Sequence, residues 1–112
     1  MLRGEIWSAV WPNDPKATPR PILIVSNNHR NSAPHLLDLV VVKITGRQRA
    51  DGTEKPVNAN EDIIYQAKKA SIIQCGAIFS IEKGTLQRRL GQLTITEMTV
   101  VDEKLKNVLD LN

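Results

Sequence analysis

Two short β-branched runs set the limits on how this chain can fold. The first is Ile22–Val25 and the second is Leu36–Ile44, and turn-forming residues bound each of them. Runs of this length and composition are typical of buried strands rather than of surface helices. We therefore expect two central strands, joined by a polar connection over residues 26–34.

Shorter segments predict the rest of a sheet. Residues 3–10 are expected to form a first strand, followed by an exposed loop over residues 11–19, because its three prolines and its Asn-Asp pair oppose regular pairing. Residues 46–62 are polar and contain an Asp51-Gly52 turn signal, which predicts a long loop or a loose hairpin. Further strands are expected at residues 63–65, 71–75, 78–81 and 89–93, with a turn at residues 83–86.

The C-terminal segment changes to a helical period. Thr94–Glu97 has the form of a capping box. After it, apolar residues recur at helical spacing: Met98, Val101, Leu105 and Val108, with Leu109 widening the stripe. We predict an amphipathic helix over residues 96–111 that packs on the sheet. Together these elements predict one α+β domain over residues 1–112, a small, mostly antiparallel β-barrel or sheet with a terminal helix.

The composition excludes several classes of protein. No window approaches the roughly eighteen apolar residues of a membrane span, and the N-terminus lacks the apolar run of a signal peptide, so a cytoplasmic protein without membrane contact is expected. Cys75 is the only cysteine, and its place at the end of an apolar strand predicts a buried structural thiol. His29 and His35 have no third ligand at recognisable spacing, and no glycine-rich phosphate motif occurs. We expect no metal and no other cofactor.

The charges are segregated along the chain. The net charge is +3, yet residues 43–55 and residues 82–89 each hold two more basic than acidic residues, whereas the last sixteen residues hold two more acidic than basic ones. This distribution is compatible with a face for an anionic partner and equally with ordinary solvated loops.

An arginine stands directly before the first β-branched run. Pro19 and Pro21 restrict the backbone on both sides of Arg20. The guanidinium fork suits phosphate oxygens and can stabilise charge that develops on a phosphorane. Thr45 follows the second run, where its hydroxyl can donate to a phosphate oxygen. On spacing alone, a solvated arginine and a strand-terminal threonine are the more common arrangement.

Ordered sequence blocks resemble a known family. They are RGEIW at 3–7, RPILIVSN at 20–27, VVVKIT at 40–45, SIIQC at 71–75 and a long acidic-aliphatic segment at 91–111. This order, which covers nearly the whole chain, is similar to that of the MazF/PemK/Kid toxins of bacterial type II toxin–antitoxin modules.

The resemblance implies an SH3-like antiparallel β-barrel of the CcdB/PemK type with a C-terminal helix, assembled as a homodimer. It implies a metal-independent, sequence-specific endoribonuclease toxin (mRNA interferase) that cuts single-stranded RNA, mainly mRNA. The ribose 2′-oxygen attacks the adjacent phosphorus and leaves a 2′,3′-cyclic phosphate and a 5′-hydroxyl. The implied partners are RNA, a cognate antitoxin, and DNA only indirectly through that antitoxin. Arg20 and Thr45 match the family's catalytic arginine and threonine.

Four further cations are expected to contact the RNA backbone: Lys16, Arg47, Arg49 and Lys55. The chain departs from the family in two places. The loop before the R-P motif is usually longer and often contains a Gly-Ser/His-Glu-Gln segment, where this chain has Asn13–Pro19. Members also commonly have an acidic-Gln-x-Arg-Thr stretch where this chain has Gly76–Ser80, and some relatives use charged residues beside the cysteine, where Gln74 and Gly76 stand here. The alternative hypotheses are a weakened or degenerate RNA-binding relative and a non-catalytic, CcdB-like gyrase poison; the latter class lacks the R-P-x-L-x-V block.

Overall fold

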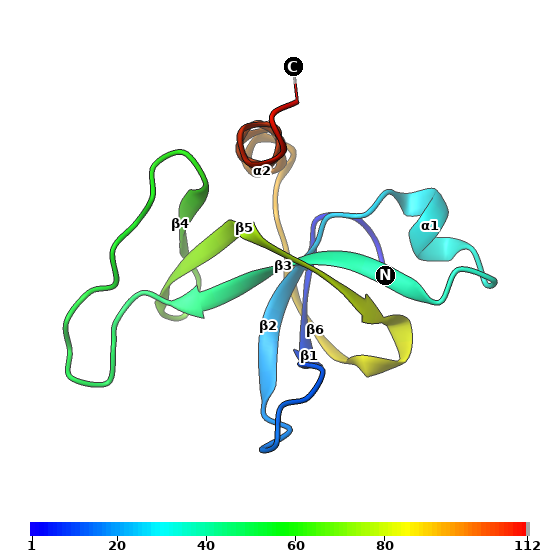
Figure 1. The fold of residues 1–112 in the computed structure, drawn as a ribbon, viewed down its shortest axis with the longest axis horizontal. Helices are drawn as coiled ribbons and strands as arrows, with labels where there is room; N and C mark the ends of the chain where they lie inside the picture. Colours follow the sequence, from blue (N-terminus) through cyan, green and yellow to red (C-terminus); the bar gives the residue numbers. More distant parts are fainter. Residues whose placement is uncertain (112) are drawn as a thin grey trace.

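A six-stranded antiparallel sheet forms the body of the protein in the computed structural model, which describes residues 1–111 (Figure 1). The strands are β1 (Glu5–Val10), β2 (Pro19–Ile24), β3 (Asp38–Gly46), β4 (Asp62–Gln66), β5 (Ala70–Glu82) and β6 (Leu86–Gln92). Their order is β4-β5-β3-β2-β1-β6, so the two predicted central strands lie side by side. Among the described residues β4 and β6 have one neighbouring strand each, and the sheet does not close into a barrel.

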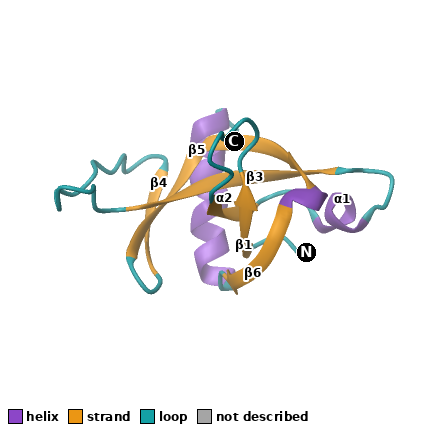
Figure 2. Ribbon diagram, turned by 90° about the horizontal axis from the view of Figure 1, so that it is seen from below, coloured by secondary structure: helices purple, strands orange, loops and turns teal. Residues whose placement is uncertain are grey.

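Helix α2 (Ile95–Leu109) lies across one side of the sheet (Figure 2). The predicted capping box is confirmed, because Thr94 Oγ1 accepts from the Glu97 amide at 3.1 Å and the Glu97 carboxylate accepts from the Thr94 amide at 2.9 Å. The helix ends two residues earlier than predicted. Asp110 adopts a left-handed backbone conformation with φ 55°, which terminates a helix.

Two apolar clusters cover the two faces of the sheet, because successive side chains of a strand point to opposite faces. The first lies under α2 and consists of Ile6, Leu23, Val42, Ile44, Ile73, Cys75, Leu93 and Val101. The second consists of Ala9, Ile22, Ile24, Leu39, Val41 and Ile81, with Trp7, Trp11 and Leu86 packed against it. The predicted burial of Cys75 is confirmed, and this burial, with the charge of Asp62 as a smaller cause, raises the pKa of its thiol to about 11.

The start of β2 differs from the prediction. Pro19 and Arg20 were expected to precede the strand, but they belong to it: Pro19 pairs with Val10 of β1, and Arg20 pairs with Ala9. A proline lacks only its own N–H donor, so it can lie in a strand wherever that donor is not required. The ladder from β2 to β3 accordingly begins only after Pro21, at Ile22.

Four segments refine the prediction. Helix α1 (Asn28–Ser32), capped by the Asn27 side chain, lies within the predicted polar connection. The two strands predicted over residues 71–81 are the single strand β5, whose register with β3 shifts between Val42 and Lys43. The loop after β3 is the loose hairpin, with an isolated bridge between Gln48 and Glu54. The turn before β6 is a 3-10 helix, η1 (Lys83–Thr85).

Candidate anion-binding site

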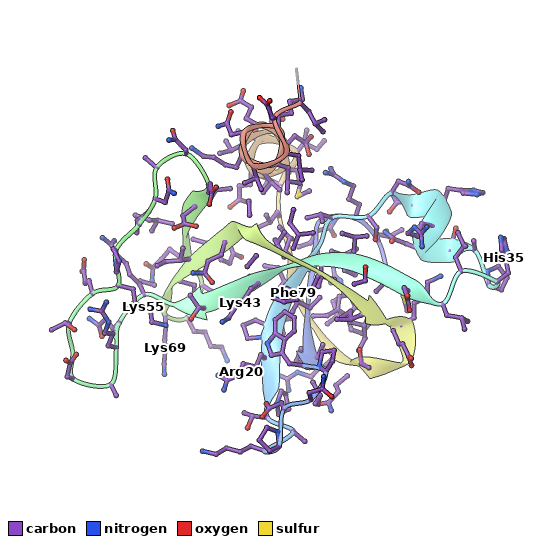
Figure 3. All side chains as sticks on the ribbon, viewed as in Figure 1. Arg20, His35, Lys43, Lys55, Lys69 and Phe79 are labelled. Atoms are coloured by element: carbon purple, nitrogen blue, oxygen red, sulfur yellow. The ribbon has the colours of Figure 1, made fainter. Side chains whose placement is uncertain are left out.

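An open notch lies where β2 separates from β3. The last residue pair that joins these two strands is Ile22–Lys43. If the antiparallel register is continued by two residues, Arg20 of β2 stands opposite Thr45 of β3, on the same face of the sheet. Figure 3 shows Arg20 and Lys43 beside this opening. The two predicted catalytic residues thus come from neighbouring strands and share one face.

The Thr45 hydroxyl is held by a second predicted residue. Lys55 Nζ, from the hairpin after β3, donates to Thr45 Oγ1 at 2.7 Å, and the Lys55 amide donates to the Arg47 carbonyl at 2.7 Å. Both side chains are half-buried. Because an ammonium group can only donate, Thr45 Oγ1 must accept in this bond, and its own hydrogen remains available for another acceptor. The contact therefore orients Thr45 as a hydrogen-bond donor.

Arg47 and Arg49, two of the predicted RNA contacts, form bonds within the hairpin that carries them. Arg47 Nη2 pairs with Glu54 Oε2 at 2.9 Å. Arg49 Nη1 donates to Thr53 Oγ1 at 3.4 Å and to the Glu54 carbonyl at 3.3 Å. Both arginines thus form bonds that stabilise the hairpin after β3. Lys16 lies exposed in the loop before β2, where its side chain makes no hydrogen bond or ion pair with another described residue.

Further cations, which the site prediction did not include, line two neighbouring cavities, whose linings include Pro21, Ile44 and Gly46 but neither Arg20 nor Thr45. A cavity of about 520 Å³ has an apolar floor and a rim that includes Lys68, Lys69, Arg88 and Arg89. An adjoining cavity of about 550 Å³ shares Lys68 and Lys69 and adds Arg47 and Arg49. The sequence signals were the Lys-Lys pair before β5 and the basic excess over residues 82–89. Lys68 and Lys69 could be placed only once β4 was known to pair with β5, and Arg88 and Arg89 only once β6 was known to pair with β1.

A buried carboxylate fixes one of these cations. Glu5 Oε2 accepts from Arg89 Nε at 2.9 Å, and Glu5 Oε1 accepts from the Leu2 amide at 2.7 Å and from Trp7 Nε1 at 3.1 Å. Burial by itself would raise the pKa of Glu5, but these hydrogen bonds together outweigh it and hold the pKa below its usual value. Arg89 is therefore a positioned cation on the cavity wall.

Neither histidine belongs to this region. His29 lies in α1 and His35 lies just after it, and Figure 3 shows His35 at the right-hand edge of the molecule, away from Arg20. Within residues 1–111 no three His, Cys, Asp or Glu side chains are placed to hold a metal ion together. No described helix has the length and apolar character needed to cross a membrane.

The fold and the site define a small α+β protein with an open notch where its two central strands separate and with basic cavities nearby. A family model described as a PemK-like, MazF-like toxin of type II toxin-antitoxin systems matches residues 2–109. The chain therefore belongs to this toxin family, as the sequence blocks indicated.

Individual relatives agree with this assignment. Endoribonuclease MazF3 of Mycobacterium tuberculosis (strain CDC 1551 / Oshkosh) is 29% identical over 93 residues, which are 83% of this chain and 84% of that protein. A mycobacterial endoribonuclease solved with its cognate antitoxin has a TM-score of 0.76 and 25% identity, covering 100% of this chain and 97% of that one. Mycobacterium tuberculosis toxin MazF-mt6 has a TM-score of 0.66 and 27% identity, covering 96% and 98%.

Proposed function

We propose that this chain is an endoribonuclease toxin that cuts single-stranded RNA at a short sequence and is inhibited by a cognate antitoxin. The proposal rests on two observations: the β2–β3 register, when continued past Ile22–Lys43, sets Arg20 opposite Thr45, and Lys55 Nζ donates to Thr45 Oγ1. Family membership and the relatives named as endoribonucleases support the same activity.

In the proposed reaction, the ribose 2′-oxygen forms a bond to the adjacent phosphorus and the bond from phosphorus to the 5′-oxygen breaks. The 2′-hydroxyl loses a proton and the departing 5′-oxygen gains one, which leaves a 2′,3′-cyclic phosphate and a 5′-hydroxyl. Negative charge increases on the non-bridging oxygens as the phosphorane forms. Arg20 stabilises that charge with its N–H donors, and Thr45 donates to one phosphate oxygen.

The residues around Cys75 restrict how protons move in this proposal. Gln74 pairs in register with Lys43, so its amide lies on the face of the notch. An amide can hydrogen-bond to RNA but does not transfer a proton at neutral pH. Gly76 offers no side chain, so the acid–base pair that some relatives carry beside this cysteine has no counterpart here. We therefore assign Arg20 to charge stabilisation as its main role.

The proposal includes the assembly that the family resemblance implies. We propose a homodimer of SH3-like units, an antitoxin that covers the basic notch, and contact with DNA only through that antitoxin. The solved complex of a related endoribonuclease with its antitoxin supports the antitoxin partner. Light scattering of the purified protein measures its mass directly, and a monomer at micromolar concentration would contradict the dimer.

The direct test is to incubate the purified protein with a long unstructured RNA in EDTA and to map the new ends. We expect cuts at one short sequence, 5′ ends that can be ligated only after phosphorylation, and 3′ ends that carry a cyclic phosphate. No cleavage at high enzyme excess would remove the enzymatic function. Growth inhibition that persists in a variant unable to cut RNA would instead favour poisoning of a protein target.

A further inference from the structure

An exposed aromatic side chain lies beside the notch. Phe79 is 43% exposed, and its ring meets the ring of Trp11 edge-on with the centroids 4.7 Å apart and the planes at 60°. In the sheet Phe79 pairs with Val41, two residues before Lys43 on β3, so Phe79 and Lys43 share one face. Figure 3 shows Phe79 on the same side of the molecule as Lys43 and Arg20.

Trp11 holds this phenylalanine in a defined orientation. The Trp11 ring packs against the second apolar cluster and is half-buried, so it is a firm support. An edge-on contact uses the edge of one ring and leaves a face of the pair for another planar group.

The charges around the aromatic pair differ on its two sides. Arg20 and Lys43 form no ion pair with any described residue, so both remain available to phosphates. The cavity of about 490 Å³ beside Trp11 is instead lined by Asp38 and Glu82. Because carboxylates repel phosphate, a nucleic acid chain is favoured on the Arg20 side, from which a base can reach Phe79.

We propose that Phe79, supported by Trp11, stacks on one nucleobase of the bound RNA, and that Lys43 neutralises a phosphate next to the one held by Arg20 and Thr45. The identity of the ligand as RNA rests on the proposed function. Since every base has a π-face, stacking is tolerant of sequence. Phe79 thus contributes affinity and places the strand in the notch, while the choice of cutting sequence lies with other residues.

The test compares two probes that cannot be cut. The first is a mixed-sequence pool of 2′-O-methyl RNA twelve nucleotides long, and the second is an abasic 2′-O-methyl chain of the same length. The variants are Phe79→Leu, which keeps apolar bulk but removes the aromatic face, and Phe79→Tyr, which retains that face. Leu109→Ala is the control, because Leu109 is similarly exposed, at 52%, but lies on α2. Thermal unfolding checks that all of them fold.

We expect Phe79→Leu to bind the base-bearing pool about 5- to 150-fold more weakly than the wild type does, while its affinity for the abasic chain stays unchanged. Phe79→Tyr and Leu109→Ala should match the wild type on both probes. Equal binding of the pool by Phe79→Leu and wild type would overturn the proposal. Equal binding of both probes by the wild type would also overturn it. A Phe79→Leu variant that binds more weakly only because its dimer has dissociated would overturn it as well.

The outcomes also separate this inference from the proposed activity. The same proteins are incubated with a long natural RNA, and cleavage is measured in parallel with binding. Base-dependent binding through Phe79 without any cleavage would support the stacking site and remove the nuclease. Cleavage with no change in binding by Phe79→Leu would retain the nuclease and remove the stacking site.

Discussion

Two basic regions of this protein look alike in sequence and differ in structure. In the hairpin after β3, Arg47 pairs with Glu54 and Arg49 bonds to Thr53, so these cations already have partners. At the notch, Arg20 and Lys43 form no ion pair with the residues that the structure describes. Only the second region holds cations that a phosphate can reach without displacing a protein partner.

The comparison shows that a count of local charges does not measure the charge available to a ligand. A ligand that binds Arg47 must first compete with the Glu54 carboxylate, whereas one that binds Arg20 displaces only water. Exposed ion pairs are individually weak, at about 0–1 kcal/mol, so a phosphate can still compete for the hairpin arginines. The difference between the two regions is therefore one of degree and can be measured.

The largest expected effect is the loss of Arg20. Arg20→Ala should reduce the rate of RNA cleavage by about 100- to 1000-fold, because it removes the donors that stabilise the phosphorane. Arg49→Ala makes the same change in the hairpin and should reduce the rate by no more than about fivefold. Single-turnover cleavage of a mapped site compares them. Equal losses in the two variants would abolish the distinction between the regions.

The next effect concerns Lys55, which links the hairpin to the notch. Lys55→Met removes the donor to Thr45 Oγ1 and should slow cleavage by about 10- to 100-fold, the value of one hydrogen bond to a charged group. Lys55→Arg should recover part of the rate, and Lys16→Met serves as a control that removes the same charge from an exposed loop. If Lys16→Met had the larger effect, Lys55 would not act through Thr45.

A smaller effect is expected in stability, through the carboxylate that anchors Arg89. The folded protein holds the pKa of Glu5 below 4.5, so the charged form contributes stability above pH 4.5 and loses it as the pH falls through the folded pKa. Glu5→Gln should lower the free energy of unfolding by about 1 kcal/mol at pH 7. The difference in free energy of unfolding between Glu5→Gln and the wild type should disappear in acid. Urea unfolding at pH 7 and pH 3.5 measures both values, and a gap that widens in acid would contradict the assignment.

The smallest effect is on the salt dependence of RNA binding. Lys43→Ala should reduce the slope of log affinity against log salt by roughly 0.7, the value for one phosphate contact to a single strand. Arg47→Ala should leave the slope nearly unchanged, whereas Glu54→Gln, which frees Arg47, should raise it by up to the same amount. Fluorescence anisotropy over a range of salt concentrations measures the slopes. A reduction of the slope by roughly 0.7 in Arg47→Ala would instead support the predicted phosphate contact of Arg47.

Local signals predicted most of the secondary structure. The capping box fixed the start of α2, and the β-branched runs identified β2 and β3, because each signal depends on residues that lie close together in sequence. Short-range rules were wrong at Pro19. They treat proline as a breaker, but whether a missing N–H matters depends on what the neighbouring strand requires.

The site was predicted in part. Arg20 and Thr45 were chosen from their motifs, and the register then placed them across one notch. Lys43 and Phe79 were not chosen, because a lysine inside an apolar run and an isolated phenylalanine have no local signature. The phosphate contact proposed for Lys43 and the stacking proposed for Phe79 depend on the pairing of β3 with β5 and on the contact between Phe79 and Trp11.

The sequence by itself determined most of the element types, the absence of paired cysteines, the family and the two leading candidates for chemistry. Only the tertiary structure decided which cations are already paired, and that the ladder between β2 and β3 ends at Ile22–Lys43 to leave a notch. The physical reason is that charge pairing and strand register are long-range properties. They depend on which distant segments meet, and a carboxylate such as Glu54 or Glu5 changes what a cation can do only once it lies within bonding distance.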